Sequence, residues 1–343
     1  MAFYDGLFDA LGLRDWCDQD AVAAPMSMAD LLKANQADAI DPNAEAFPFP
    51  SLDELHSACG KISQTRDFTT GIEDSFLAAR AGLKTVLDPI TQPLSWALDS
   101  TLYVFEITPW WIIVPLLVAF AWVVSRSKWV TAFVAGSFLF LGAIDHLHLA
   151  LQTLSIIFVC TGISVLLGVP TGIAMSKSNL LQKIMVPILD LLQTLPTFVY
   201  LIPLIFLFSV TESKLYGIAI ILYAIVPVIR LTDLGIRLVD KDVLEAADAY
   251  GMSASQRMTK VELPLALPNI MAGVNQTIMM SLAMVVIASL VSAPGLGVLV
   301  LRGIRNLELG VGLVAGFGIV LLAVILDRTS KAALSRVDKA GKQ

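Results

Sequence analysis

Long apolar runs are the feature that most limits what this chain can fold into. A bilayer core about 30 Å thick is crossed by roughly 20 apolar residues in a helix, and seven segments after residue 109 approach that length. Each has to be helical, because lipid offers no hydrogen-bond partner to an exposed backbone amide. The sequence therefore predicts an all-α integral membrane protein with about seven transmembrane helices. The expected spans are 110–124, 129–144, 153–175, 184–208, 215–229, 270–291 and 310–326.

The composition agrees with this class and divides the chain in two. Charged residues make up 15% of the 343 residues, and the mean hydropathy is +0.76, whereas soluble domains contain about 25% charged residues. Residues 1–100 carry 16 acidic and 6 basic side chains, but 101–343 carry 13 acidic and 17 basic ones. The two parts are thus expected to lie in different surroundings.

Residues 1–90 are interpreted as an acidic tail outside the cytoplasm. The tail is either solvated or presents an acidic surface to a partner. It lacks a basic start followed by a long apolar stretch, so we expect no secretory signal peptide. A disulfide between Cys17 and Cys59 is chemically permitted outside the cytoplasm, whereas Cys160 lies in an apolar run.

Residues 91–108 follow the tail and have the pattern of an amphipathic helix. Apolar side chains recur at helical spacing, and polar side chains lie on another side. Pro93 falls in the expected first turn, where a missing amide N–H removes no hydrogen bond. We expect the helix either to lie in the membrane interface or to pack on the protein's own tail. The apolar positions are Leu94, Leu98, Leu102 and Phe105, and the polar ones are Ser95, Asp99 and Glu106.

Basic residues alternate between the predicted loops and so give an orientation. Lysines and arginines follow the first, third, fifth and seventh spans, whereas the loops after the second and fourth spans are poor in them. Cytoplasmic loops carry the excess of basic residues, so we expect the N-terminus outside and the tail 331–343 in the cytoplasm. The outer loop 292–309 departs from this rule with Arg302 and Arg305. Its glycines suggest that it dips back toward the protein.

The cytoplasmic loop 230–269 carries the most specific pattern in the chain. Its roughly 40 residues exceed the usual helix connection of about 2–8, so we expect it to fold. Paired alanines allow another helix to approach closely, and Gly251 can adopt the positive φ that ends a helix. Glu245 would make a polar contact with a partner, and an ordinary surface helix with a glycine cap is the alternative. The pattern consists of Glu245, Ala246, Ala247, Gly251, Leu263 and Pro264.

This spacing resembles the EAA signature of ATP-binding-cassette importer permeases. In that family the segment forms a coupling helix that docks on the ATPase subunit. The stretches 193–203 and 227–237 are similar to the glycine betaine/proline betaine permeases, and the resemblance covers about residues 145–330. The chain departs from that pattern at Val226, where relatives often have proline, and at Pro294, where they often have glycine. Choline and trimethylamine N-oxide are therefore as plausible as glycine betaine as the transported solute.

The resemblance implies a division of labour between several chains. Two copies of the permease would form a homodimer, two ATPase subunits would bind ATP and magnesium, and a separate extracytoplasmic protein would deliver the solute. That receptor would hold a quaternary ammonium group by cation–π contacts. The sequence has no glycine loop ending in Lys-Ser/Thr, so we expect no cofactor, no enzymatic activity and no nucleic acid partner. Two helices in 109–145 would precede the core permease 146–330 in a bacterial inner membrane.

Residues that line the transport pathway are predicted from polar side chains within spans, together with Phe198, which follows the middle proline of its span, and Met284, which lies near the polar residues of the span 270–291. Pro187, Pro196 and Pro203 should kink the span 184–208 and free backbone carbonyls. Polar groups within a span usually face protein or water, and helix–helix hydrogen bonding is the equal alternative to a lining role. The candidates are Gln193, Thr194, Phe198, Tyr200, Asn275, Gln276, Ser281 and Met284.

Two other functions fit parts of the sequence. An ion-coupled secondary transporter needs an ionisable group near the bilayer midplane, and Asp190 is the one acid well inside a span. Pairing of Asp190 at a helix interface is the other interpretation. A membrane enzyme could use Asp145, His146 and His148 as metal ligands, although three residues on one short turn make a thin site.

Overall fold

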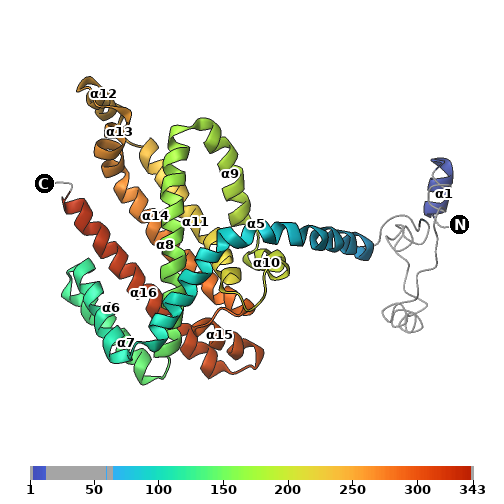
Figure 1. Cartoon of the computed structure of the whole chain (residues 1–343), viewed down its shortest axis with the longest axis horizontal. Helices are drawn as coiled ribbons and strands as arrows, with labels where there is room; N and C mark the ends of the chain where they lie inside the picture. Colours follow the sequence, from blue (N-terminus) through green and yellow to red (C-terminus); the bar gives the residue numbers. More distant parts are fainter. Residues whose placement is uncertain (1–2, 13–58, 60–64, 341–343) are drawn as a thin grey trace. The chain divides into compact units, whose positions relative to one another are not determined.

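The computed structural model describes residues 3–12, 59 and 65–340, and all the described secondary structure is helical (Figure 1). The chain divides into two units, Met1–Ala81 and Gly82–Gln343. The first holds α1 (Phe3–Ala10) and the start of α5 (Thr65–Ile107). Most of the predicted acidic tail, including Cys17, lies outside the described residues, so its disulfide stays a prediction.

The second unit holds the rest of α5 and all later helices. These are α6 (Trp110–Ser125), α7 (Lys128–Ala143), α8 (Leu147–Lys177), α9 (Asn179–Thr194), α10 (Leu201–Leu207), α11 (Ser213–Arg237), α12 (Lys241–Ala249), α13 (Ala254–Arg257), α14 (Leu263–Ala288), α15 (Leu296–Arg305) and α16 (Leu309–Ala340), with 3-10 turns at Thr197–Tyr200 and Ser289–Val291 and a π-helical turn at Met258–Glu262.

Within the part of the chain that the structure describes, four helical segments are long and apolar enough to cross a membrane alone: α8, α11, α14 with the turns beside it, and α16. Two bent pairs raise the number to six if each pair is one span, namely α5 with α6, bent by 116°, and α9 with α10, bent by 105°. The remaining predicted span, α7, has 16 residues and is about 24 Å long, which is shorter than the roughly 30 Å of a bilayer core. The all-α membrane class is confirmed, and the count of seven spans stays a prediction.

The predicted span 184–208 is a broken helix, not a kinked one. Pro196 explains the break, because it lacks an amide N–H and forces the preceding residue out of the helical conformation. Leu195 accordingly has an extended backbone with ψ of 133°. The Tyr200 hydroxyl donates hydrogen bonds to the carbonyls of Leu192 and Leu195, so the broken segment is held by its own side chain.

The amphipathic helix predicted at 91–108 is the end of a longer helix. α5 begins at Thr65, so Pro93 lies inside the helix and not in its first turn. The predicted apolar face packs on α11, where Leu98 is buried against Gly217. The charged residues between 65 and 90 leave no apolar run long enough to span lipid, so the sequence did not predict this part of the helix.

Polar side chains also fasten α5 to its neighbours. Lys214 at the start of α11 is buried, and its Nζ lies 2.7 Å from carboxylate oxygens of Asp88 and Glu212. Gln152 of α8 donates a 2.9 Å hydrogen bond to Glu106. Partial burial raises the pKa of Glu212, but the hydrogen bond and charge of Lys214 outweigh this effect and lower it.

The centre of the second unit is formed by α8, α11 and α14, which approach one another at glycines. A Cβ on Gly172 of α8 would lie 2.6 Å from the Cβ of Thr232, and one on Gly273 of α14 would lie 3.0 Å from the Cα of Val228. Small residues allow the close backbone contact on which helix association in membranes depends. A larger side chain at either glycine would separate these helices.

The predicted inner and outer loops lie at opposite ends of this unit. Figure 1 shows α12, α13 and the turn between α8 and α9 at one end, and α15 with the turn between α7 and α8 at the other. The loop 292–309 folds back onto the protein as predicted, since the amide of Leu296 donates a 2.9 Å hydrogen bond to Oγ1 of Thr153 in α8.

Candidate coupling site and transport pathway

The predicted cytoplasmic loop is folded and contains α12, α13 and the π-helical turn. The loop is shorter than expected, because α11 continues to Arg237 and α14 begins at Leu263. The connection between α11 and α14 is therefore 238–262, and the cytoplasmic placement of 230–269 stays a prediction. Asp240 caps the start of α12, and its Oδ1 accepts a 3.0 Å hydrogen bond from the amide of Asp242, which satisfies a donor that the helix itself leaves unpaired.

Gly251 ends α12 with the positive φ predicted for it, +75°. The amide of Met252 donates to the carbonyl of Ala247 at 3.2 Å, and the amide of Gly251 donates to that of Asp248 at 2.9 Å. This pair of bonds is a Schellman motif, which requires a left-handed residue at the position of Gly251. A Cβ there would meet nothing within 4 Å, so the backbone angle alone makes glycine necessary.

One face of α12 is open. Val243 is 41% exposed and Tyr250 is 88% exposed, and Ala246 between them is also exposed. These three residues, three and four positions apart, lie on one side of the helix and form what we call the α12 patch, with exposed Glu245 adjacent to Ala246. Ala247 is buried against its own chain, so the paired alanines face in different directions.

A series of ion pairs fixes the side of α12 that carries Asp248. Arg257 donates from Nη1 to both carboxylate oxygens of Asp248, at 2.7 and 2.6 Å, and from Nε to Glu262 at 3.0 Å. Lys177, at the end of α8, donates to the other oxygen of Glu262 at 2.6 Å. We call Lys177, Asp248, Arg257 and Glu262 the Glu262 network. The network joins α12 to the end of α8 and to the start of α14.

Sequence reasoning missed Glu262, although it stands one position before the noted Leu263 and Pro264. Its side chain is 2% exposed, and a buried carboxylate needs charged partners. A single acidic residue directly before an apolar helix could have indicated a buried ion pair. Its partner Lys177 in α8 is 85 residues away in the sequence, so the pair itself could not be identified. Leu263 packs with buried Ile236 and Ala266, and Pro264 lies in the first turn of α14.

A second polar cluster fixes the turn between α8 and α9 to the end of α11. Arg237 donates to Asp233 at 2.8 Å, to Oδ1 of Asn179 at 3.0 Å and to the carbonyl of Met175 at 2.7 Å. Gln182 of α9 donates to the same Asp233 at 2.7 Å. The ends of three core helices are thus tied together beside α12.

The pathway candidates at the helix break have different surroundings. Gln193, Thr194 and Phe198 are exposed, whereas Tyr200 is buried. Gln193 reaches α14, where its amide lies 3.6 Å from Sδ of Met280. The exposed members surround the bend, and their lining role stays a prediction.

The candidates in α14 contact their own helix bundle. Asn275 hydrogen-bonds an aspartate and a serine of α16, and Ser281 accepts a 3.1 Å hydrogen bond from Thr161 of α8. These two residues make the helix–helix contacts that were the alternative to a lining role. Met284 is buried and Gln276 is exposed.

Asp190, the residue on which ion coupling would rest, forms an ion pair with Arg230 of α11. The pairing interpretation of Asp190 is therefore confirmed. His146 lies with Nδ1 2.5 Å from the carbonyl oxygen of Ile144. Within the described residues, no three His, Cys, Asp or Glu side chains gather as a metal ion would require.

Comparison with known proteins gives the family. Residues 164–339 match the family described as binding-protein-dependent transport system inner membrane component. The glycine betaine/carnitine transport permease protein GbuB of Listeria monocytogenes is 40% identical over 247 residues, which cover 71% of this chain and 87% of GbuB.

Two further relatives are longer than the region they share with this chain. The glycine betaine/proline betaine permease ProW of Escherichia coli is 46% identical over 57% of this chain and 55% of its own length. The trimethylamine N-oxide permease TmoV of Ruegeria pomeroyi is 38% identical over 60% of this chain and 31% of its own length. The chain belongs to the inner membrane components of binding-protein-dependent transport systems and is a multi-pass protein of the inner membrane.

Proposed function

We propose that this chain is the permease subunit of an ATP-driven importer for a small quaternary-amine or methylamine solute. The relatives are named for glycine betaine, carnitine, proline betaine and trimethylamine N-oxide, which all carry a methylated nitrogen. The solute of this transporter is therefore a small compound with a methylated nitrogen, such as glycine betaine, proline betaine, trimethylamine N-oxide or choline, for which another relative is named.

The observation that carries the proposal is the open face of α12. The α12 patch exposes apolar side chains at the end of a polar connection, while the Glu262 network fixes the opposite side to the core. An exposed apolar patch rimmed by polar residues is typical of a protein interface. We assign this face to an ATPase subunit, which binds ATP and magnesium and contacts Ala246 and Tyr250. Exposed Glu245, one position before Ala246, would make a polar contact with the ATPase at the edge of this face.

Movement of α12 would be transmitted to the transport pathway through direct side-chain contacts. Glu262 connects α12 to the start of α14 and the end of α8, and Gln193 connects the break in α9 to α14. Two copies of the chain would enclose the pathway and alternate between inward and outward openings. A separate receptor would deliver solute on the side of α15, with the N-terminus outside and the C-terminus in the cytoplasm.

The first test is gentle purification of the chain from native membranes, followed by mass spectrometry of the proteins that accompany it. We expect a nucleotide-binding ATPase and a solute-binding protein, whose ligand titration identifies the solute. The variant Glu245→Lys should lose the ATPase, whereas Arg305→Glu, which reverses a charge in α15 at the other end, should keep it. Full ATP-driven uptake by Glu245→Lys would contradict the coupling role.

A further inference from the structure

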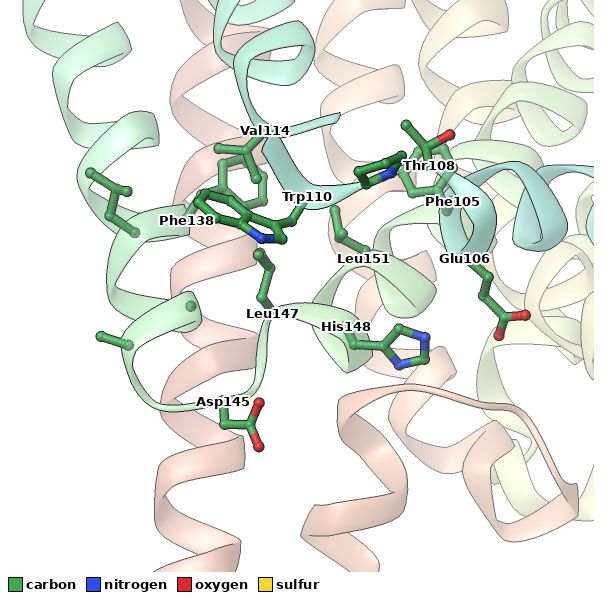
Figure 2. Close-up of a pocket in the computed structure, with 14 residues that line it drawn as sticks. Phe105, Glu106, Thr108, Trp110, Val114, Phe138, Asp145, Leu147, His148 and Leu151 are labelled. Atoms are coloured by element: carbon green, nitrogen blue, oxygen red, sulfur yellow. The ribbon is translucent and has the colours of Figure 1, made fainter. Parts of the chain in front are cut away.

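A cavity of about 690 Å³ lies where α5, α6, α7 and α8 meet, at the end of the unit opposite α12. Figure 2 shows the Trp110 indole directly above Leu147, with His148 and Glu106 on one side and Asp145 below. Among the described residues that line the cavity, two are carboxylates and none is a lysine or arginine. The cavity thus offers aromatic and negative groups to a ligand.

An apolar groove of about 570 Å³ shares walls with this cavity. Phe105 of α5 and Phe138 of α7 line both. Along α8 the lining passes from Leu147 and Leu151 in the cavity to Leu154 and Phe158 in the groove. The eleven residue steps from Leu147 to Phe158 span about 16 Å of helix, so the groove continues from the cavity along α8.

The groove lies in the part of the protein that the bilayer surrounds. Phe120 and Phe158, which line it, are 58% and 67% exposed, and both belong to apolar helices of an inner membrane protein. In that setting the molecule that covers such a groove is a lipid chain. Trp110, which lines the adjoining cavity, is of a residue type that is enriched at the membrane interface.

We propose that the cavity and groove together bind one phospholipid whose headgroup carries an ammonium group. An acyl chain fills the groove, and the ammonium group lies in the cavity, whose lining includes the Trp110 indole and the carboxylates of Glu106 and Asp145, because aromatic faces and carboxylates attract a cation. The indole N–H of Trp110 and the His148 ring can donate hydrogen bonds to the lipid phosphate. An anionic headgroup without an ammonium group would be repelled by the two carboxylates, because no positive charge would offset them. The inference needs only the membrane setting and not the transported solute.

The test uses the whole purified transporter in detergent. The protein is exchanged with equal amounts of phosphatidylethanolamine and phosphatidylglycerol of identical acyl chains, and the retained lipid is counted by native mass spectrometry. We expect about one phosphatidylethanolamine per chain, preferred about fivefold, as two partly exposed ion pairs allow. Equal retention of both lipids by the unmodified protein would overturn the proposal.

Two conservative changes remove the charges without disturbing the fold. Glu106→Gln keeps the acceptor for Gln152, and Asp145→Asn keeps a residue type that tolerates the φ of +59° found there. The double variant should retain both lipids equally. A preference that persists in this variant would show that the carboxylates do not select the headgroup.

A third variant separates a lipid from a small soluble cation. Ala119→Trp places a large side chain in the groove and should abolish retention of either lipid, whereas Leu313→Trp on the exposed surface of α16 should not. If Ala119→Trp retains lipid fully while millimolar choline saturates the cavity, the site binds a free quaternary ammonium ion and the proposal is wrong.

Discussion

The Glu262 network predicts how firmly α12 is held for docking. Glu262 accepts hydrogen bonds from Lys177 at 2.6 Å and from Arg257 at 3.0 Å, and Glu262→Gln keeps its shape while removing its charge. A hydrogen bond to a charged group contributes about 1.5–3 kcal/mol. Because Lys177 is 45% and Arg257 is 27% exposed, water replaces part of each bond. We therefore expect a loss of about 1 kcal/mol for each bond, or about 2 kcal/mol in all.

This loss should appear as weaker binding of the ATPase, since α12 is then held in place less of the time. A loss of about 2 kcal/mol corresponds to roughly 30-fold weaker binding, and Lys177→Gln, which removes one of the two bonds, to about fivefold. The assay titrates the purified ATPase onto the permease in nanodiscs. Arg302→Gln removes the exposed Arg302–Glu308 pair at the other end and should change nothing. Unchanged affinity in Glu262→Gln would refute the reasoning.

Three further predictions concern the turn of α12, the break in α9 and the attachment of α5. Gly251→Ala should cost about 1 kcal/mol through its φ alone and reduce ATP-driven uptake, whereas Gly251→Asn, which tolerates this angle, should reduce it less; equal losses would contradict the backbone argument. Pro196→Ala restores an amide N–H and should let α9 continue, so uptake should fall, and unchanged uptake would show that the break is dispensable. Because Lys214 lowers the pKa of Glu212 below its ordinary 4.5, the stability contributed by Glu212 is present above that pH and is lost as the pH falls through the lowered value. Thermal unfolding between pH 7 and pH 3 should therefore shift less in Glu212→Gln, and an identical pH profile would contradict the assignment.

Local patterns in the sequence were enough to predict several features of the site. The folded connection, the helix around Glu245 and the positive φ of Gly251 all follow from spacing within about 25 residues, where helix periodicity and capping rules apply. The membrane class follows from apolar runs of sufficient length. Such features depend on near neighbours along the chain.

Features set by distant contacts were not predictable in the same way. Lys177 and Glu262 lie 85 residues apart in the sequence, and the residue types alone do not show that the two side chains pair. The sharp bend at Pro196 was expected only as a kink, because the angle depends on how the two pieces pack. Likewise the attachment of α5 depends on Lys214, which meets Asp88 across 126 residues.

The most direct test of the central claim is uptake of radiolabelled glycine betaine, choline and trimethylamine N-oxide into proteoliposomes that contain this chain, its co-purified ATPase and its solute-binding protein. We predict uptake of at least one of these solutes that requires ATP, persists when ionophores collapse both the proton and the sodium gradient, and is lost in Glu245→Lys. Uptake that needs an ion gradient and proceeds without ATP would contradict the account and favour ion coupling through Asp190.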